Sequence, residues 1–267
     1  MNEATVILFG MTRNLSSFTD SFEATLIEPL RERGMAVRVV GDLNLPTQVV
    51  NPRSQENGKI DSPDPLLDVY PGLRCHSQND EDVADDFRFY AQFPDRWDDE
   101  FRSLRNLLQQ QKSLTLGTQL ALERPASLYI FIRPDLAYHD SFGSALDLAL
   151  AAKKETLVVP AWQFCGGLND RFAIASGPRA AAIYGLRIEK GREFCEHSDA
   201  GLHAERLLAY VVGTSRIPYR FMSQRASRVR LDGTVRHEDF SIKPRRMIRT
   251  KLRTLMFPKS YSRSRVS

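Results

Sequence analysis

Short apolar runs alternate with helically spaced apolar residues along much of this chain. Residues 4–9 and 35–40 are mainly apolar runs that predict buried strands. Between them, residues 20–33 place apolar side chains three and four positions apart, which predicts an amphipathic helix, and Gly34 suits its end. Strand, helix and strand in this order form the unit of a parallel sheet.

The middle of the chain has a different composition. Residues 44–71 hold five prolines and many Asn, Asp and Ser, so we predict a long loop there. Residues 80–93 are acidic and predicted to be helical. Residues 98–123 carry a helical apolar face that Gly117 could interrupt.

The second half repeats strand and helix signals. The pattern predicts strands, helices and a connecting loop as follows: strands at 129–132, 156–159, 172–175, 218–222 and 226–231; helices at 141–152, from Pro178 and at 203–212; a loop at 160–171; and a turn at Asp232-Gly233. The predicted fold is therefore α/β, with a Rossmann-like, mixed but mainly parallel sheet flanked by helices over residues 1–239.

Charge is distributed unevenly. Residues 240–267 hold nine Lys and Arg and no Asp or Glu, which leaves 28 basic and 33 acidic side chains in residues 1–239. The body is thus mildly acidic and the C-terminal tail strongly basic. Within the tail a helical period joins Met247, Ile248, Lys251, Leu252, Leu255 and Met256.

We predict that residues 240–267 form a basic amphipathic tail that suits an anionic membrane surface. A tail docked on the acidic body, or one without fixed structure, is the alternative. No aromatic–basic pattern indicates nucleic-acid binding.

The remaining composition points to the cytoplasm. The three cysteines form no C-x-x-C pair and their number is odd, which favours a reducing compartment. No signal peptide and no apolar run of about 20 residues is apparent. We therefore expect a cytoplasmic protein, held peripherally on the inner face of the membrane by its tail.

An arginine and an aspartate at a strand end give the most informative chemical signal. The run at 129–132 should stop at Pro134, which cannot donate to a sheet ladder. Arg133 and Asp135 would then project from the carboxyl edge, where open α/β sheets bind ligands. An aspartate there can hold a cation or a ribose hydroxyl, and an arginine can hold a phosphate. A structural Arg–Asp pair is the alternative.

The loop after the first strand offers a second candidate. Gly10 would let the backbone approach a ligand, and Arg13 could neutralise a phosphate. An ordinary turn with a surface arginine is the alternative.

Residues 160–171 offer a third candidate. Gly166 and Gly167 permit close approach of a substrate, and three polar side chains follow them: Asn169, Asp170 and Arg171. Trp162 has a flat face of the kind on which sugar rings pack. The alternative is a tight turn whose Asn and Asp bond their own backbone.

His203 and Glu205 open the helix predicted at 203–212. An acidic residue in a first turn is favoured by the helix dipole whatever its role. As a catalytic base, Glu205 would need to point into a cleft and accept a hydroxyl proton.

Taken in order, these segments resemble the glycosyltransferase A-type fold of nucleotide-sugar-dependent enzymes, over about residues 4–231. Arg133-Pro134-Asp135, Asn169-Asp170-Arg171-Phe172-Ala173 and the helix with Glu205 are similar to a branch found among bacterial capsule and lipopolysaccharide proteins. The resemblance implies transfer of a sugar from a nucleotide-sugar to a hydroxyl of a surface-polysaccharide or lipid-linked glycan.

The resemblance also implies residue roles. Gly10, Arg13, Arg133, Asp135, Gly166 and Gly167 would bind the donor; Glu205 or Asp170 would act as base; and Trp162, Asn169, Arg171 and His203 would contact the acceptor. Asp135 would be the ligand of Mn²⁺ or Mg²⁺.

One departure from the family matters. Arg133 stands where the usual Asp-x-Asp motif has its first carboxylate. Either Arg133 compensates the leaving diphosphate without a metal, or donor binding is lost and the protein is a non-catalytic sugar-binding or scaffolding member of a polysaccharide assembly complex.

Overall fold

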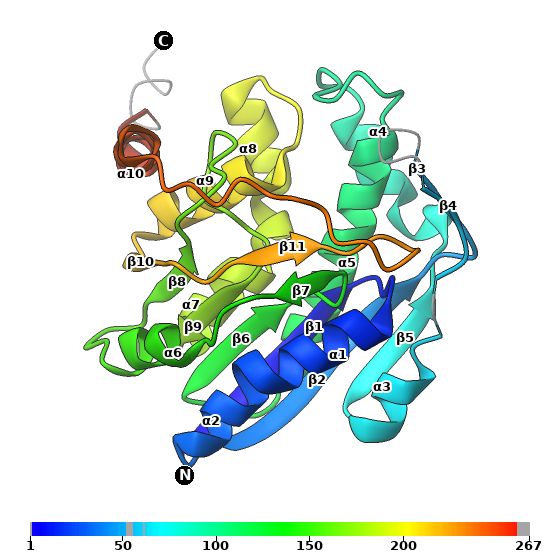
Figure 1. Ribbon diagram of the computed structural model, residues 1–267. Coiled ribbons are helices and arrows are strands. Elements are labelled where there is room, and N and C mark those ends of the chain that lie inside the picture. Colours follow the sequence, from blue (N-terminus) through cyan, green and yellow to red (C-terminus); the bar gives the residue numbers. More distant parts are fainter. Residues whose placement is uncertain (1, 52–55, 61, 261–267) are drawn as a thin grey trace.

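A seven-stranded sheet forms the centre of the protein in the computed structural model, which describes residues 2–51, 56–60 and 62–260 (Figure 1). Its order is β10-β8-β9-β6-β1-β2-β5, and paired strands run parallel except for β9, which is antiparallel to β6 and β8. The strands are β1 (Glu3–Gly10), β2 (Ala36–Leu45), β5 (Leu73–Ser77), β6 (Leu128–Ile132), β8 (Leu157–Pro160), β9 (Ala173–Ser176) and β10 (Tyr219–Met222). The predicted α/β class with a mainly parallel sheet is confirmed.

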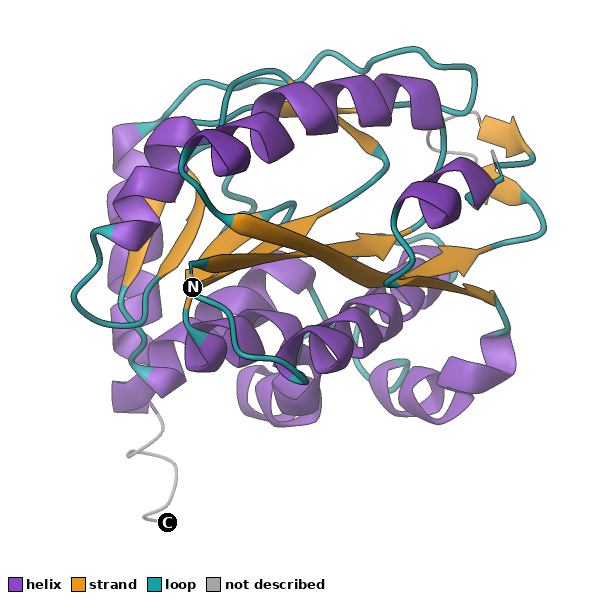
Figure 2. Ribbon diagram, turned by 90° about the horizontal axis from the view of Figure 1, so that it is seen from below, coloured by secondary structure: helices purple, strands orange, loops and turns teal. Residues whose placement is uncertain are grey.

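Helices cover both faces of this sheet (Figure 2). In β1, Val6 and Leu8 point into one apolar core and Ile7 and Phe9 into the other, as strand alternation requires. The first core is completed by α1 (Leu15–Phe22), the π-helical turn η1 (Glu23–Ile27), α2 (Glu28–Glu32) and α6 (Gly143–Leu150). The second is completed by α5 (Arg102–Leu122), α7 (Pro178–Gly185) and α9 (Ala204–Ser215).

The remaining elements surround this three-layer body. Two short pairs join β7 (Leu136–Tyr138) to β11 (Ala226–Arg228) and β3 (Val49–Asn51) to β4 (Glu56–Gly58), both antiparallel. The other helical segments are α3 (Asp64–Val69), η2 (Asp80–Val83), α4 (Ala84–Tyr90), η3 (Arg187–Lys190), α8 (Gly191–Ser198) and α10 (Pro244–Ser260). No helix within the described residues is long and apolar enough to cross a bilayer.

Gly117 lets α5 lie directly on the sheet. A Cβ atom at this position would lie 3.1 Å from Ile7 Cγ2 and 3.4 Å from the Cα of Gly41. The helix runs through Gly117 without a break, so the predicted interruption is wrong: the glycine is needed for close packing.

The predicted loop at 44–71 is also wrong in part. The segment contains the end of β2, the β3–β4 pair and α3. Pro63 and Pro65 lie at the start of α3, where proline is tolerated because the first helical N–H groups have no intrahelical partner. These two prolines therefore begin a helix.

The order of the strands sets where a ligand can bind. From β1 the chain moves through β2 to β5 on one side, and later returns to place β6 on the other side of β1. Such a reversal opens a crevice at the carboxyl ends of the two central strands. Gly10 ends β1 and Arg133 follows β6, so both lie at this crevice.

Candidate active site

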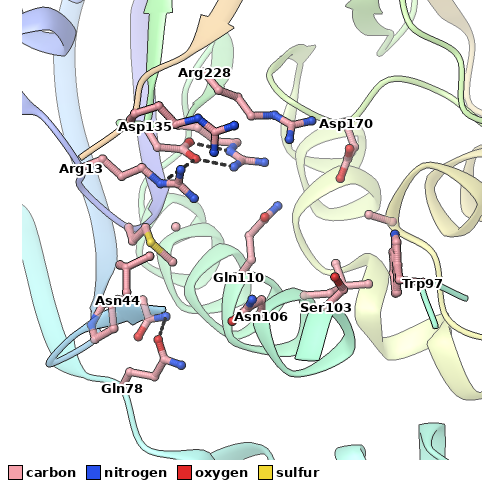
Figure 3. A pocket seen from close by; sticks show the side chains of 18 of the residues that line it. Arg13, Asn44, Gln78, Trp97, Ser103, Asn106, Gln110, Asp135, Asp170 and Arg228 are labelled. Carbon is pink, nitrogen blue, oxygen red and sulfur yellow. Dashed lines mark hydrogen bonds and ion pairs between the residues drawn. The ribbon is translucent and has the colours of Figure 1, made fainter. Parts of the chain in front are cut away.

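A cleft of about 560 Å³ occupies the carboxyl edge of the sheet (Figure 3). Four strand ends line it through Gly10, Asn44, Gln78 and the Arg133–Asp135 turn. Helix α5 forms its floor and the start of α9 forms one wall. The cleft therefore lies at the strand end that the sequence analysis predicted from Pro134 and Asp135.

Arg133 and Asp135 form a closed ion pair. Arg133 Nε lies 2.9 Å from Asp135 Oδ1, and Nη2 lies 2.7 Å from Oδ2, so both carboxylate oxygens are engaged. Burial alone would raise the pKa of Asp135, but the Arg133 charge and its hydrogen bonds outweigh burial and lower that pKa to about 2. The pair remains ionised at neutral pH.

This geometry does not fit a divalent cation. A hard cation needs several free oxygen ligands. Both oxygens of Asp135 already accept hydrogen bonds from Arg133. In addition, Nε of a second arginine, Arg13, lies 4.0 Å from Asp135 Oδ2. Among the residues that the structure describes, no group of three or more His, Cys, Asp or Glu is placed to hold a metal ion. Asp135 instead holds an arginine in place.

Glu56 anchors two further arginines at the rim. Both of its oxygens lie 2.9 Å from Arg13 Nη1, and Oε2 lies 2.5 Å from Arg230 Nη1. Arg13 follows β1, Glu56 lies in β4 and Arg230 follows β11, so three distant segments meet here. Arg13 lines the cleft. Its contact with a donor phosphate stays a prediction.

Arg228 adds a further positive charge to the cleft, which Arg13, Arg133 and Arg230 also line. Its pKa is lowered to about 10, first by burial and then by the charges of Arg171 and Arg133. Glu238 Oε1 lies only 3.6 Å from its Nε and offsets part of this repulsion. The Arg228 side chain lines the cleft and extends from above Asp135 toward Asp170 (Figure 3). A bound anion would relieve the repulsion between these arginines.

Two carboxylates line the opposite wall. Asp170 Oδ2 lies 3.0 Å from Nη2 of the fully buried Arg187. Glu205 accepts a 2.5 Å hydrogen bond from the backbone N–H of Cys165 and lies 3.8 Å from Arg171 Nη1. Burial, followed by the charge of Asp170, raises the pKa of Glu205 to about 8. A buried carboxyl group whose pKa is raised in this way is typical of acid–base sites.

The predicted acceptor contacts around Asn169 lie behind the cleft wall. Asn169 is buried and its Nδ2 donates to Trp162 O at 2.8 Å. Arg171 donates to Gln163 Oε1 at 2.5 Å, and its guanidinium lies 5.0 Å from the Trp162 ring centroid. These residues shape the loop that presents Asp170 and Cys165. They do not line the cleft.

Trp162 is not available as a sugar platform. Its side chain is 1% exposed, its Nε1 donates to Gln224 O at 2.8 Å and Phe240 packs edge-on against its ring. The prediction of a sugar contact is contradicted because tertiary packing covers both the ring and its N–H.

Trp97 is the aromatic residue that does line the cleft. Its ring stacks on His203 with centroids 5.7 Å apart and an interplanar angle of 13°. The Asp95 carboxylate holds the loop by accepting from the N–H groups of Trp97, Asp99 and Phe101. Burial lowers the pKa of His203 to about 4, so the imidazole that supports Trp97 is neutral at pH 7.

Gly166 and Gly167 serve packing and do not line the cleft. A Cβ atom on Gly167 would lie 1.9 Å from the carbonyl oxygen of Glu205, and the Leu168 N–H donates to that oxygen at 3.0 Å. Gly166 has φ +94°, which a side chain would strain. The predicted border with a donor sugar is wrong; the glycines let the loop contact the first turn of α9.

Gly167→Ala is expected to destabilise the fold by about 1–3 kcal/mol, the usual cost of overpacking, and to displace Glu205. Urea unfolding measures the change. Gly58→Ala is the matched control, since its Cβ would meet only the Leu231 side chain at 3.4 Å. Equal stability of the two variants would contradict the role given to Gly167.

Several cleft residues were not predicted from the sequence. Helix α5 contributes Ser103, Asn106 and Gln110, a polar stripe at spacings of three and four beside the apolar face. Arg228 is the last residue of β11 and Arg230 lies two positions after it, so in an extended segment their side chains share one side. Both patterns are visible in the sequence and indicate that these residues share a face. Neither pattern shows which cavity that face lines.

Comparisons with known proteins describe the fold only. No protein-family description and no curated protein matches the sequence. Mouse xyloside xylosyltransferase 1 shares 8% identity over 83% of this chain and 85% of its own, with a TM-score of 0.38. Galactosyltransferase LgtC, in complex with donor and acceptor sugar analogues, shares 13% identity over 81% of this chain and 72% of its own, with a TM-score of 0.41.

A third solved structure is similar over nearly the whole chain. It comes from Bacillus anthracis, is assigned as a glucose-1-phosphate thymidylyltransferase and holds sucrose; identity is 10% over 94% of this chain and 95% of its own, with a TM-score of 0.39. At such identities a shared fold does not identify the reaction, which is determined by the residues of the cleft.

Proposed function

We propose that the cleft binds a nucleotide-sugar and transfers its sugar to a hydroxyl of a surface-polysaccharide or lipid-linked glycan acceptor. One observation carries the proposal: Arg13, Arg133 and Arg228 gather where the central strands end, across the cleft from two carboxylates (Figure 3). Arginine is well suited to bind the oxygens of a diphosphate. A carboxylate facing that site can take a proton from an attacking hydroxyl.

The proposed step follows from this arrangement. Glu205 removes the proton of the acceptor hydroxyl, and the oxygen forms a bond to the anomeric carbon of the donor. The bond between that carbon and the diphosphate breaks, and the nucleoside diphosphate leaves with the electron pair. The three arginines stabilise the charge that develops on it, which is the role that a metal would otherwise have.

The acceptor would lie between Trp97 and the start of α9. Trp97 offers an aromatic surface in the cleft, and His203 holds its ring. Asp170 and Glu205 lie along the same wall. Trp97 thus takes the role that the sequence assigned to Trp162.

Calorimetric titration with UDP-, GDP- and CMP-sugars tests donor binding directly. We expect one nucleotide class to bind with equal affinity in EDTA and in manganese, because the residues around Asp135 do not fit a cation. Absence of binding to every donor under both conditions would overturn the proposal. It would favour the alternative of a non-catalytic scaffolding protein.

Arg228→Gln is expected to weaken donor binding by about 10- to 150-fold, the value of one charge-assisted hydrogen bond. The same titration measures it. Arg225→Gln is the matched control, because Arg225 pairs with Asp140 outside the cleft and does not line it. A similar loss in both variants would indicate a general charge effect and not a phosphate contact.

Asp170→Asn is expected to move the pH–rate profile to lower pH. The charge of Asp170 raises the pKa of Glu205, so its removal lets Glu205 lose its proton at lower pH. Initial rates measured from pH 5 to 10 would show the rising limb of wild type near pH 8 and that of the variant below it. An unmoved limb would mean that another group controls the profile.

A further inference from the structure

Helix α10 presents its large apolar side chains to solvent. Ile248, Leu252 and Leu255 are 55%, 55% and 67% exposed. Their spacing of four and three places them on one face of the helix. Large apolar residues gathered on one exposed helix face mark an interaction surface.

The opposite face of α10 packs on the protein through small polar residues. Thr250 and Thr254 are 6% and 1% exposed, and Thr254 Oγ1 donates to Thr250 O at 2.9 Å. Arg253 Nη1 donates to Gly166 O at 3.0 Å, and Lys251 Nζ lies 5.3 Å from the Phe221 ring centroid. The helix lies beside α9 at the edge of the molecule (Figure 1).

This orientation is the reverse of an ordinary surface helix, which buries its apolar face. Docking on the body therefore does not explain the apolar period of the tail. The stripe of Ile248, Leu252 and Leu255, called here the α10 stripe, lies outward while the helix is already held by other contacts.

The positive charge of α10 indicates which kind of partner would cover the α10 stripe. Arg245, Arg246 and Arg249 are exposed on the same helix, and residues 240–267 contain no Asp or Glu. An isologous contact through this stripe would bring two purely basic helices together and is disfavoured by charge repulsion. An apolar stripe beside a purely basic set fits a surface with acyl chains beneath anionic groups.

We propose that the α10 stripe inserts into the interface of an anionic lipid bilayer, with Arg245, Arg246 and Arg249 at the headgroups. Bound in this way, α10 would hold the protein on the membrane without a spanning helix. This binding is independent of sugar transfer, so it can be tested, and can fail, separately from the proposed function.

Co-sedimentation of the full chain with vesicles tests the proposal. We expect the protein to bind phosphatidylcholine vesicles that contain phosphatidylglycerol far better than pure phosphatidylcholine vesicles, and to dissociate as salt is raised. Ile248→Ser, Leu252→Ser and Leu255→Ser together should weaken binding more than about 10-fold. All three side chains are exposed, so the fold should be retained, which circular dichroism checks.

Two controls separate the stripe from general hydrophobicity and charge. Val69→Ser with Leu150→Ser removes exposed apolar side chains on α3 and α6, which are 64% and 41% exposed, and should leave vesicle binding unchanged. Arg245→Gln with Arg249→Gln should weaken binding to the anionic vesicles and reduce its salt dependence.

Three outcomes would overturn the proposal. They are no binding to anionic vesicles at low salt, binding that the triple serine variant retains, and a dimer detected by light scattering that the triple variant dissociates while no vesicle binding occurs. The last would assign the α10 stripe to a second copy of the chain.

Discussion

Glu205→Gln is expected to lower sugar transfer by about 10²- to 10⁴-fold, the usual contribution of a general base, with the fold intact. Glutamine keeps an oxygen for the Cys165 N–H but cannot take a proton from the acceptor. Because the pKa of Glu205 is raised to about 8 by burial and by Asp170, the wild-type rate should rise as pH passes 8. The residual rate of the variant should lack this rise.

The ionisation of Glu205 should affect stability in the opposite direction to activity: the transfer rate rises with pH, whereas the free energy of unfolding falls. The pKa of Glu205 in the fold lies above its ordinary value of 4.5, so this group contributes stability that is complete below pH 4.5 and lost as pH rises through about 8. Glu205→Gln should therefore be more stable than wild type at pH 9, relative to their difference at pH 4, by urea unfolding.

Glu196→Gln serves as control, since Glu196 is exposed on α8. Its transfer rate and pH profile should match wild type. If Glu205→Gln retained full transfer as well, the base would have to be Asp170 or a group outside this wall.

Asp135→Ala is expected to destabilise the protein by about 3–5 kcal/mol, the cost of removing one partner from a buried ion pair. The change leaves Arg133, whose side chain is 19% exposed, without its bidentate partner and with Arg13 and Arg228 nearby. Urea unfolding at pH 7 measures the loss. Donor binding should also fall, because Arg133 loses the contact that orients it.

A double variant distinguishes the ion pair from simple packing. Arg133→Leu with Asp135→Leu removes both charges and should recover most of the lost stability, since apolar replacement of buried pairs is often neutral. Donor binding should not recover. The pKa of Asp135 is lowered to about 2 from 3.8, so the wild-type advantage should be complete above pH 4 and decline as pH falls toward 2. No loss in Asp135→Ala at pH 7 would contradict this account.

Much of the fold could be predicted because the strongest local patterns belong to its centre. Residues 4–9 are apolar except for Thr5, and residues 129–132 are apolar throughout; they lie in β1 and β6, which are buried on both faces. Their ends, Gly10 and Arg133, were therefore placed correctly. The sequence of β5 is LRCHS and β7 has only three residues, so neither shows an apolar pattern long enough to be identified as a strand.

Roles within the site were harder to predict because a residue type does not specify its surroundings. Two tryptophans were equally suited to a sugar ring, and only tertiary packing places Trp162 in the core and Trp97 at the cleft. Gly167 was read as room for a ligand, whereas its space is filled by the Glu205 carbonyl. Local sequence carries no information on which neighbour occupies a space.

The segment after β10 adds residues to the cleft only when the chain is nearly complete. β11 pairs with β7, and the Val229 N–H donates to Asp135 O at 3.0 Å, which brings Arg228 over a sheet whose seven strands all lie earlier in the sequence. A nascent or proteolysed chain that ends before Ala226 would keep every strand of that sheet and lack Arg228 and Arg230. Two of the arginines that line the cleft are therefore acquired late in synthesis. Under the proposed function, a chain without them would bind a phosphate ligand more weakly, so this binding would report whether the segment after β10 is intact.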